Sequence, residues 1–448
     1  MVSGQVKSGA SALVRLPKAE LHLHLEGCLY PMQVVQLAAR YGEKLRYGEV
    51  AARYNTQSFP AFLELFKWAT SYLRDPQDYA LLCEHPGLHL VAENCVYAEI
   101  TLSVGVMLLR KQNVEANFAA IRDGVDRYAK PSGLRVRWIF DAVRQFGPEK
   151  AMEVARLAAQ TKSAGVVAFG LGGDEESLPA SDFRKVFDYA AAEGLHRVAH
   201  AGEMAGPQAV RDALEILGAE RIGHGIAAIH DEKLMDLLIE RQIPLEICPT
   251  SNLRTGALAK LLARNFPSDA RATHSSAGRS FSLPAAAGSD INPQGITGAS
   301  APESDSLRND SVKVGTRRDV TPVSGGGSFS SHVNSPEKTG ALAPEAPQLP
   351  REDISPNDQI LPAAAGLEDH PLAQFIARGV PVILASDDPA MFRTTLLAEY
   401  TLALAKMGLT VPQLISVAEA SFRHAFLPAT EKNSLLANFH AASKLNPL

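Results

Sequence analysis

The sequence predicts an α/β fold in which eight short strands alternate with helices and a long low-complexity segment precedes the last strand. Two observations predict this fold. Hydrophobic residues make up 46% and charged residues 21% of the 448 residues, which is close to the average of globular proteins. Short strand-like runs are separated by stretches whose apolar residues recur every three or four positions, the spacing of amphipathic helices.

The strand-like runs follow one another along the whole chain. They occupy residues 20–26, 97–103, 136–143, 166–172, 197–202, 222–225, 244–248 and 380–386. Amphipathic segments lie between them, for example at 149–165 and 231–242. Strands that alternate with helices pair in parallel. Eight is the number of strands in a (β/α)8 TIM-type barrel, so we expect that barrel; periodicity by itself leaves an open doubly wound sheet as the alternative.

The composition changes abruptly after residue 265. The segment 266–367 contains 11 of the 28 prolines of the chain together with 16 serines, and it follows neither helical nor strand periodicity. Such a segment buries too little apolar surface to offset the entropy lost on ordering. We therefore expect a long disordered insertion between strands 7 and 8, with a small folded insert as the alternative. Residues 14–265 and 368–448 are then expected to form a single barrel.

Charge and cysteine usage restrict the partners and the compartment. The net charge is −5 and the isoelectric point is near 6.2, so no basic excess is present to bind nucleic acid or an anionic membrane. No apolar run approaches the roughly 18 residues of a membrane span, and the first residues lack the apolar core of a secretory signal. The four cysteines form no CxxC pair and are expected to be reduced. We expect a cytoplasmic protein.

Histidine and aspartate lie at or near the C-terminal ends of five of the eight runs. In a parallel barrel these ends meet on one face, where active sites lie. His22 and His24 are two residues apart on a strand, so both imidazoles point to the same side, as two metal ligands must. His200 and Asp387 lie at the ends of the fifth and eighth runs. The alternatives are buried or solvated histidines, and a helix cap for the DDP run.

Imidazole and carboxylate ligands on one rim suit Zn²⁺, and Fe, Mn, Ni and Co are not excluded by ligand type. A catalytic metal lowers the pKa of its water and creates a hydroxide nucleophile. Glu203, which closely follows His200, could then move a proton. His224, flanked by two glycines, could orient or deprotonate the water. The simpler alternatives are a carboxylate at a helix start and a tight turn.

Several other catalytic signatures are missing from the sequence. It contains no HExxH, GxSxG or Walker A motif, and no PCxxC pair of the zinc deaminases that edit nucleic-acid bases. An aromatic-rich helical stripe lies between the first two strands. We expect it either to pack in the core or to cover a flat heterocycle as a lid; its members are Phe59, Phe62, Leu65, Phe66 and Trp68.

Six motifs, taken in order, resemble those of the adenosine deaminase family of metal-dependent hydrolases. They read PKAELHLHLEG, VVAFGLGGDE, HAGE, RIGHG, CPTSN and SDDPAMF, and they extend over both blocks of the chain while skipping the insertion. The resemblance implies a (β/α)8 barrel with one zinc ion per chain and a small purine substrate that reacts with water. By motif matching, the implied zinc ligands are His22, His24, His200 and Asp387.

The resemblance also implies a role for each residue around a purine ring. Glu203 would donate a proton to N1, and His224 would position the hydroxide that attacks C6. Asp388 would hydrogen-bond the N7 side and the hydroxide, and the backbone N–H of Gly173 would contact N3. His24 and Glu26 would also line the substrate site. The implied reaction is hydrolytic deamination, such as that of adenosine or deoxyadenosine to inosine or deoxyinosine with release of ammonia.

Two positions depart from the adenosine-specific pattern of the family, and a third departs from the pattern of the adenine branch. Glu26 stands where those members usually have an aspartate that touches the ribose 5′ end, and it resembles the branch that deaminates free adenine. Gly223 stands where that adenine branch often has aspartate. Thr101 stands where adenosine-type members usually have arginine, and it resembles members that act on 6-aminodeoxyfutalosine in menaquinone synthesis. We expect adenosine or deoxyadenosine first, aminodeoxyfutalosine next and adenine third.

Two functions of other classes remain as alternatives. One is a catalytically silent nucleoside-binding barrel, against which the complete set of seven matched polar residues argues. The other is amide or phosphoester cleavage on the same kind of barrel. Such barrels often use a carboxylated lysine between two metals, and no lysine lies at the end of the fourth run.

Overall fold

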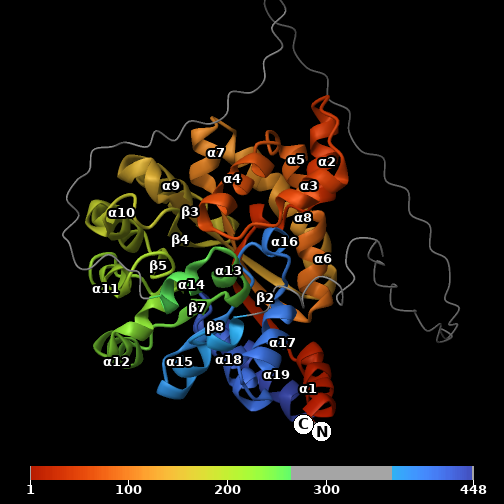
Figure 1. Ribbon diagram of the computed structural model, residues 1–448. Helices are drawn as coiled ribbons and strands as arrows, with labels where there is room; N and C mark the ends of the chain where they lie inside the picture. The colour runs from red at the N-terminus through yellow and green to blue at the C-terminus, as the bar shows by residue number, and fades with distance from the viewer. Residues whose placement is uncertain (1, 264–365, 446–448) are drawn as a thin grey trace, which may run out of the picture. The chain divides into compact units, whose positions relative to one another are not determined.

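The computed structural model describes residues 2–263 and 366–445, which belong to one compact unit. Apart from its last two residues, the insertion expected at 266–367 lies outside the described residues. Eight strands form one parallel sheet whose spatial order is the order of the chain (Figure 1). They are β1 (Lys18–His24), β2 (Cys95–Leu102), β3 (Arg135–Val143), β4 (Val166–Gly172), β5 (His196–Ala201), β6 (Arg221–His224), β7 (Leu245–Ile247) and β8 (Val382–Leu384).

The sheet closes on itself where the segment after β8 meets β1. Leu23 forms a parallel bridge with Asp387. The N–H of His24 donates to the carbonyl of Asp387 at 2.8 Å, and the N–H of Asp387 donates to the carbonyl of His22 at 2.9 Å. These bonds confirm the TIM-type barrel and exclude the open sheet. All eight expected strands are present; the first ends earlier than expected, because Glu26 belongs to a 3-10 turn, η1 (Glu26–Cys28).

Helices surround the sheet (Figure 1). Before β3 lie α1 (Val2–Arg15), α2 (Pro31–Arg40), α3 (Tyr47–Arg53), α4 (Phe59–Thr70), α5 (Pro76–Leu82), α6 (Glu84–Ala92), α7 (Val104–Leu109) and α8 (Val114–Ser132). Between β3 and β7 lie η2 (Arg144–Phe146), α9 (Gly147–Gln160), η3 (Lys162–Ala164), α10 (Ala180–Ala192), α11 (Pro207–Glu215), η4 (Ile226–His230) and α12 (Glu232–Arg241). After β7 lie α13 (Pro249–Arg254), α14 (Ala257–Leu262), η5 (Leu367–Asp369), α15 (Leu372–Arg378), α16 (Pro389–Phe392), α17 (Leu396–Lys406), α18 (Val411–Arg423) and α19 (Ala429–Leu445).

The core has two layers because the strands are covered on both faces. The larger layer lies between the outer faces of the strands and the surrounding helices. A small inner cluster, made of Ile139, Ala168, Val198 and Phe426, brings together β3, β4, β5 and the segment after α18. Residues on one strand face recur every second position, so Val198 shares the inner face with His200. Apolar side chains thus fill one end of the barrel, and the polar residues of the site lie at the other.

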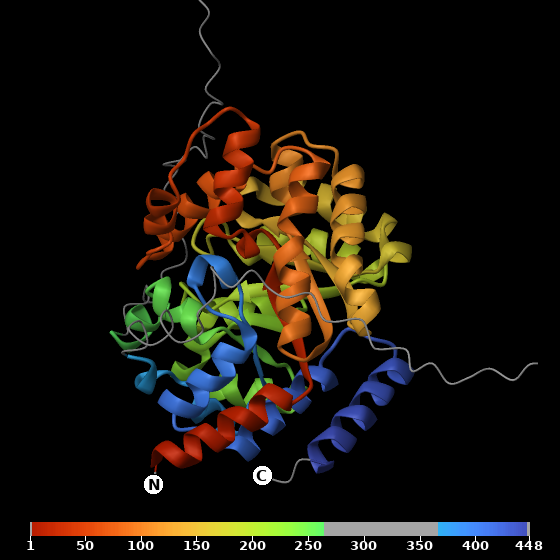
Figure 2. The same ribbon diagram turned by 90° about the vertical axis from the view of Figure 1, so that its right-hand side faces the viewer.

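The first and last helices lie away from the rim where the strands end. Helix α1 packs against α17, and α19 packs against α18 (Figure 2). Because α1 leads directly into the start of β1, it belongs to the end of the barrel opposite the C-terminal ends of the strands. Among residues 2–263 and 366–445, no helix is long and apolar enough to cross a membrane.

Candidate active site

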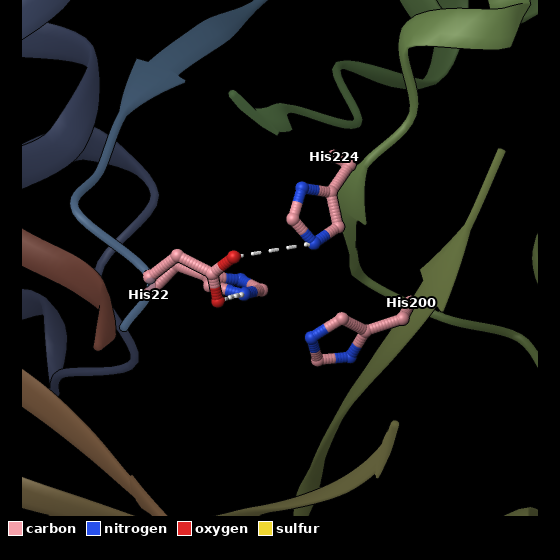
Figure 3. A group of neighbouring side chains, drawn as sticks. His22, His200 and His224 are labelled. Carbon is pink, nitrogen blue, oxygen red and sulfur yellow. Dashed lines mark ion pairs between the residues drawn. The ribbon is translucent and has the colours of Figure 1, made fainter. Parts of the chain in front are cut away.

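Four histidines and one aspartate converge at the C-terminal rim of the barrel. His22 and His24 come from β1, His200 from β5 and His224 from β6, and Asp387 follows β8. Figure 3 shows His22, His200 and His224 turned toward one common centre. One ligand atom from each of these three and from Asp387 lies within 4.8 Å of all the others. His24 reaches the same place, since its Nε2 lies 3.2 Å from Nε2 of His200 and 3.5 Å from Oδ1 of Asp387.

The structure therefore brings together the four ligands expected from the sequence, and it places His224 equally near. The donor atoms fit a metal ion. Nε2 of His22 is buried without a hydrogen-bond partner among the described residues and lies 3.4 Å from Oδ1 of Asp387. Several imidazole nitrogens around one buried carboxylate form the donor set that divalent transition metals prefer.

The charges of these groups suit metal binding. Burial lowers the pKa of His24 to about 4 and the pKa of His200 well below 6.5, and the neighbouring His22 adds to both shifts. Burial raises the pKa of Asp387, but the nearby His22 and the other surrounding imidazoles outweigh burial and hold that pKa well below 3.8. Neutral imidazoles and an ionised carboxylate are the protonation states that ligands must have.

A buried chain of ion pairs supports His22 from below the rim. Its Nδ1 lies 2.6 Å from Oε2 of Glu246, so Nδ1–H donates to the carboxylate and Nε2 is the nitrogen that faces the centre. Burial lowers the pKa of His22, but Asp387 and Glu246 outweigh burial and raise it well above 6.5, so a metal bound at Nε2 would take the place of a proton. Nε of Arg221 donates to Oε1 of Glu246 at 2.5 Å, and its Nη2 lies 2.6 Å from Oε2 of Glu99. Sequence reasoning missed these three supporting residues, although the motifs RIGHG and PLEIC and the run YAEIT contain them.

The backbone turns two of the site residues toward the centre. His224 has φ of 59° and Asp387 has φ of 62°, a region that residues other than glycine rarely adopt. Strand alternation alone would place His224 opposite Gly223, whose missing Cβ would lie 2.9 Å from the His22 ring. The left-handed backbone redirects the His224 side chain to the face that Gly223 occupies. Strained backbone of this kind is found at functional sites.

A relay of hydrogen bonds sets the protonation of His224. The N–H of Leu372 donates to Nδ1 of His370 at 3.2 Å, so the proton of that ring is on Nε2. This Nε2 lies 3.2 Å from Oδ1 of Asn252, and Nδ2 of Asn252 lies 3.1 Å from Nδ1 of His224. Burial lowers the pKa of His224 to about 4. His224 is therefore neutral, with its proton on the Nε2 that faces the site, and it can donate a hydrogen bond there.

Glu203 lies beside this imidazole in a buried position. Its Oε2 is 3.6 Å from Nε2 of His224, and its Oε1 accepts a hydrogen bond from the hydroxyl of Thr255 at 3.0 Å. Burial, Asp387 and Glu175 together raise the pKa of Glu203 well above 4.5. A raised pKa favours the protonated form of a carboxyl, which is the form that acts as a general acid.

The second aspartate of the DDP run packs against the turn after β1. Burial and the adjacent Asp387 raise the pKa of Asp388 well above 3.8. A Cβ at Gly27 would lie 2.0 Å from Oδ1 of Asp388, so this close approach requires glycine. Glu26 is also buried; its Oε1 accepts a hydrogen bond from the N–H of Ser103 at 3.0 Å, and burial raises its pKa to about 7. Thr101 lies directly opposite His24 on β2.

The β4 turn places Gly173 close to the side chain of Gln145. Gly173 has φ of 94°, and a Cβ there would lie 2.4 Å from Oε1 of Gln145, so the turn depends on glycine.

The aromatic stripe of α4 mainly packs in the core, as one of its two interpretations predicted. Phe62 is buried and its ring lies 4.7 Å from that of Phe392 in α16, which follows Asp388.

Comparison with known proteins identifies the family. The family model described as "Adenosine deaminase" matches residues 17–270 and 356–442. The chain belongs to the adenosine deaminase family. The resemblance drawn from the six motifs is thereby confirmed, and the protein is a hydrolytic deaminase that acts on a C–N bond.

Two curated relatives of this deaminase carry different names. An aminodeoxyfutalosine deaminase of Streptomyces avermitilis is 40% identical over 256 residues, which cover 56% of this chain and 72% of the relative. An adenine deaminase of Agrobacterium fabrum is 33% identical over 238 residues, which cover 53% of this chain and 73% of the relative. A solved amidohydrolase from Burkhoderia ambifaria with bound Zn has the same fold, with a TM-score of 0.69 and 18% identity over 98% of this chain and 93% of that one.

Proposed function

We propose that this deaminase binds one zinc ion and removes the 6-amino group of a 6-aminopurine nucleoside by hydrolysis. One observation carries the proposal: a buried His/Asp cluster lies next to Glu203, a buried carboxyl whose pKa is raised well above 4.5. We assign the metal to His22, His24, His200 and Asp387. The zinc in the amidohydrolase of the same fold supports the choice of metal. All four cysteines are buried and free, which supports the expected cytoplasmic location.

A divalent metal bound at this cluster supplies a Lewis acid that lowers the pKa of a water molecule to near neutrality. Glu203 donates its proton to N1 of the purine, which makes C6 more electrophilic. The oxygen of a water molecule attacks C6, and the C6–N bond breaks. One proton of that water passes to the leaving amino group, which departs as ammonia, and the other returns to Glu203, so the product keeps the proton on N1. The hydrogen-bond relay from Leu372 places the ring proton of His224 on Nε2. His224 therefore orients the attacking oxygen as a hydrogen-bond donor. This assignment favours orientation over deprotonation as the role of His224.

Two further groups hold the purine ring in place. The N–H of Gly173 contacts N3, and Asp388 bonds to the N7 side. The raised pKa of Asp388 lets its carboxyl donate a hydrogen bond to N7, which is an acceptor. These contacts fix the plane of the ring, so that C6 faces the ligand cluster and N1 faces Glu203.

We propose 6-aminodeoxyfutalosine as the first substrate, with adenosine or deoxyadenosine second and free adenine third. This order differs from the one expected from the sequence alone, because two relatives with that name are 40% identical to this chain and a third is 35% identical, whereas four adenine deaminases are 33–36% identical. Thr101 in place of arginine supports the same choice. Glu26 supports adenine as an alternative, because it is the residue of the adenine branch.

A substrate panel tests this proposal. Ammonia release is measured for aminodeoxyfutalosine, adenosine, deoxyadenosine, adenine and AMP, with enzyme reconstituted with zinc and with enzyme stripped by a chelator. We expect kcat/KM for aminodeoxyfutalosine to exceed that for adenine by at least about 10-fold, a difference of about 1.4 kcal/mol in transition-state binding. Zinc-loaded protein that releases ammonia from none of the five would contradict the proposed activity. A preference for adenine would overturn the nucleoside assignment.

A further inference from the structure

A single carboxylate outside the assigned site is hydrogen-bonded to the turn that carries Glu203. Glu175 lies in the turn after β4, and it accepts hydrogen bonds from three successive backbone N–H groups after β5. Its Oε2 is 2.6 Å from the nitrogen of Gly202, and its Oε1 is 2.9 Å from the nitrogens of Glu203 and Met204. Glu175 makes none of the contacts assigned to the metal or to the purine, although its charge contributes to the raised pKa of Glu203.

The turn after β5 is shaped to receive an anion. Gly202 has φ of 73°, and a Cβ there would lie 2.4 Å from Cγ2 of Val210, so the left-handed turn requires glycine. Successive N–H groups in such a turn point to one side and form a concave nest for negative charge. A carboxylate that accepts several N–H bonds makes stronger bonds than a neutral acceptor. Glu175 supplies this charge from within the chain.

The turn that carries Glu175 is itself hydrogen-bonded to the segment that follows β3. Oε1 of Gln145, in η2, accepts a hydrogen bond from the N–H of Asp174 at 3.0 Å, and Gly173 lies directly beside that amide group. Continuous contacts therefore join η2 to the β4 turn, and the β4 turn to the β5 turn. The two groups that this link joins are the N–H of Gly173 and the carboxyl of Glu203.

We propose that Glu175 is a positioning residue that fixes the distance between Gly173 and Glu203, and so the spacing of the contacts to N3 and N1 of the purine. The inference rests on the proposed function, because it takes those two contacts from it. Glu175 touches neither the substrate nor a ligand of the metal in this arrangement. Its loss is expected to impair proton donation without loss of metal.

Glu175→Gln is the first test, and Glu176→Gln is the matched control. Glutamine has one acceptor oxygen, and its NH₂ group faces an N–H of the nest, so at least one of the three bonds is lost. The control changes the adjacent residue, which is exposed and pairs with Lys260 at 2.8 Å. We expect Glu175→Gln to lower kcat by about 100-fold, the loss that a displacement of about 1 Å produces. KM and bound metal should stay within about threefold of the parent.

A second measurement does not depend on substrate. Deuterium exchange of the backbone amides is followed by mass spectrometry in a peptide that spans residues 200–206. We expect faster exchange in Glu175→Gln and parental exchange in Glu176→Gln. Unchanged exchange in Glu175→Gln would overturn the inference whatever substrate the enzyme takes. Faster exchange with parental kcat would show that the hydrogen bonds of Glu175 stabilise the turn but do not position Glu203. This outcome would also overturn the inference.

Glu175→Asp covers the case in which the glutamine variant does not fold. Aspartate keeps the charge but is shorter by one methylene group, so it cannot bond all three N–H groups from the same backbone position. We expect a lower kcat and faster exchange here as well. Parental kcat and parental exchange in Glu175→Asp would show that a negative charge near the turn is sufficient. This outcome would overturn the inference that the length of the Glu175 side chain positions Glu203. A parent enzyme with no deaminase activity would instead refute the proposed function.

Discussion

Replacing Arg221 with methionine is expected to lower the free energy of unfolding by about 3–5 kcal/mol. The Arg221 side chain is 1% exposed and lies between Glu99 and Glu246, which are both fully buried. Methionine fills part of the space over the ring of Phe426, where the guanidinium lies at 3.8 Å, but it leaves two carboxylates without their cation. Removal of one partner from a buried ion pair leaves an uncompensated charge and costs about that much.

The loss is expected to depend on pH. Burial raises the pKa of Glu246, but Arg221 and His22 outweigh burial and hold that pKa below 4.5 in the folded protein. A carboxyl with a depressed folded pKa adds stability above its unfolded pKa, and this stability is lost as the pH falls through the folded pKa. In Arg221→Met the pKa of Glu246 rises, so its ionisation opposes folding. The difference between parent and variant should be widest near pH 7 and should narrow below about pH 4.5.

Urea unfolding followed by circular dichroism measures the free energy of unfolding of parent and variant at pH 7 and at pH 4. Arg378→Met is the control, because Arg378 pairs with Asp236 at 2.9 Å and both side chains are largely exposed. An exposed pair contributes at most about 1 kcal/mol. If Arg221→Met lowers the free energy of unfolding no more than the control does at pH 7, Arg221 does not compensate the two buried carboxylates. The same conclusion follows if the loss in free energy of unfolding is equal at pH 7 and pH 4.

Three further predictions concern the site and the insertion. Glu203→Gln should keep its metal and lose about 10²–10⁴-fold in kcat, and a near-parental rate would remove Glu203 from the mechanism. His22→Ala and Asp387→Ala should each lose stoichiometric zinc, and full occupancy by metal mass spectrometry would contradict the ligand set. Replacing residues 268–364 with a short Gly/Ser linker should leave folding, zinc content and kcat within a few-fold, since loop closure costs only about 0.6 kcal/mol per doubling of length; an insoluble or zinc-free product would show that the segment is structural.

Local sequence patterns predicted the strands and the residues that follow them, because alternation and strand ends are local properties. They did not predict Arg221 or Glu246 as supports for His22, since His22 and Glu246 are 224 positions apart in the chain. Strand alternation also cannot place His224, whose side chain reaches the site through a positive φ. Glu175 is part of a recognised motif, but its partners are backbone amides of another turn, and no side-chain pattern reveals them.

Opposite pKa shifts in the adjacent residues Asp387 and Asp388 suit the two roles that we propose for this rim, metal binding and purine binding. The imidazoles around Asp387 outweigh burial and lower its pKa, whereas burial and the adjacent Asp387 raise the pKa of Asp388. Two carboxyls whose pKa values are pushed apart can take different roles. The ionised one suits a cation, and the protonated one can donate a hydrogen bond to a ring nitrogen. Glu203 extends the second role, because burial and the same negative charge of Asp387 raise its pKa. The charge of Asp387 therefore favours a cation at the cluster and also raises the pKa of both neighbouring acids, Asp388 and Glu203.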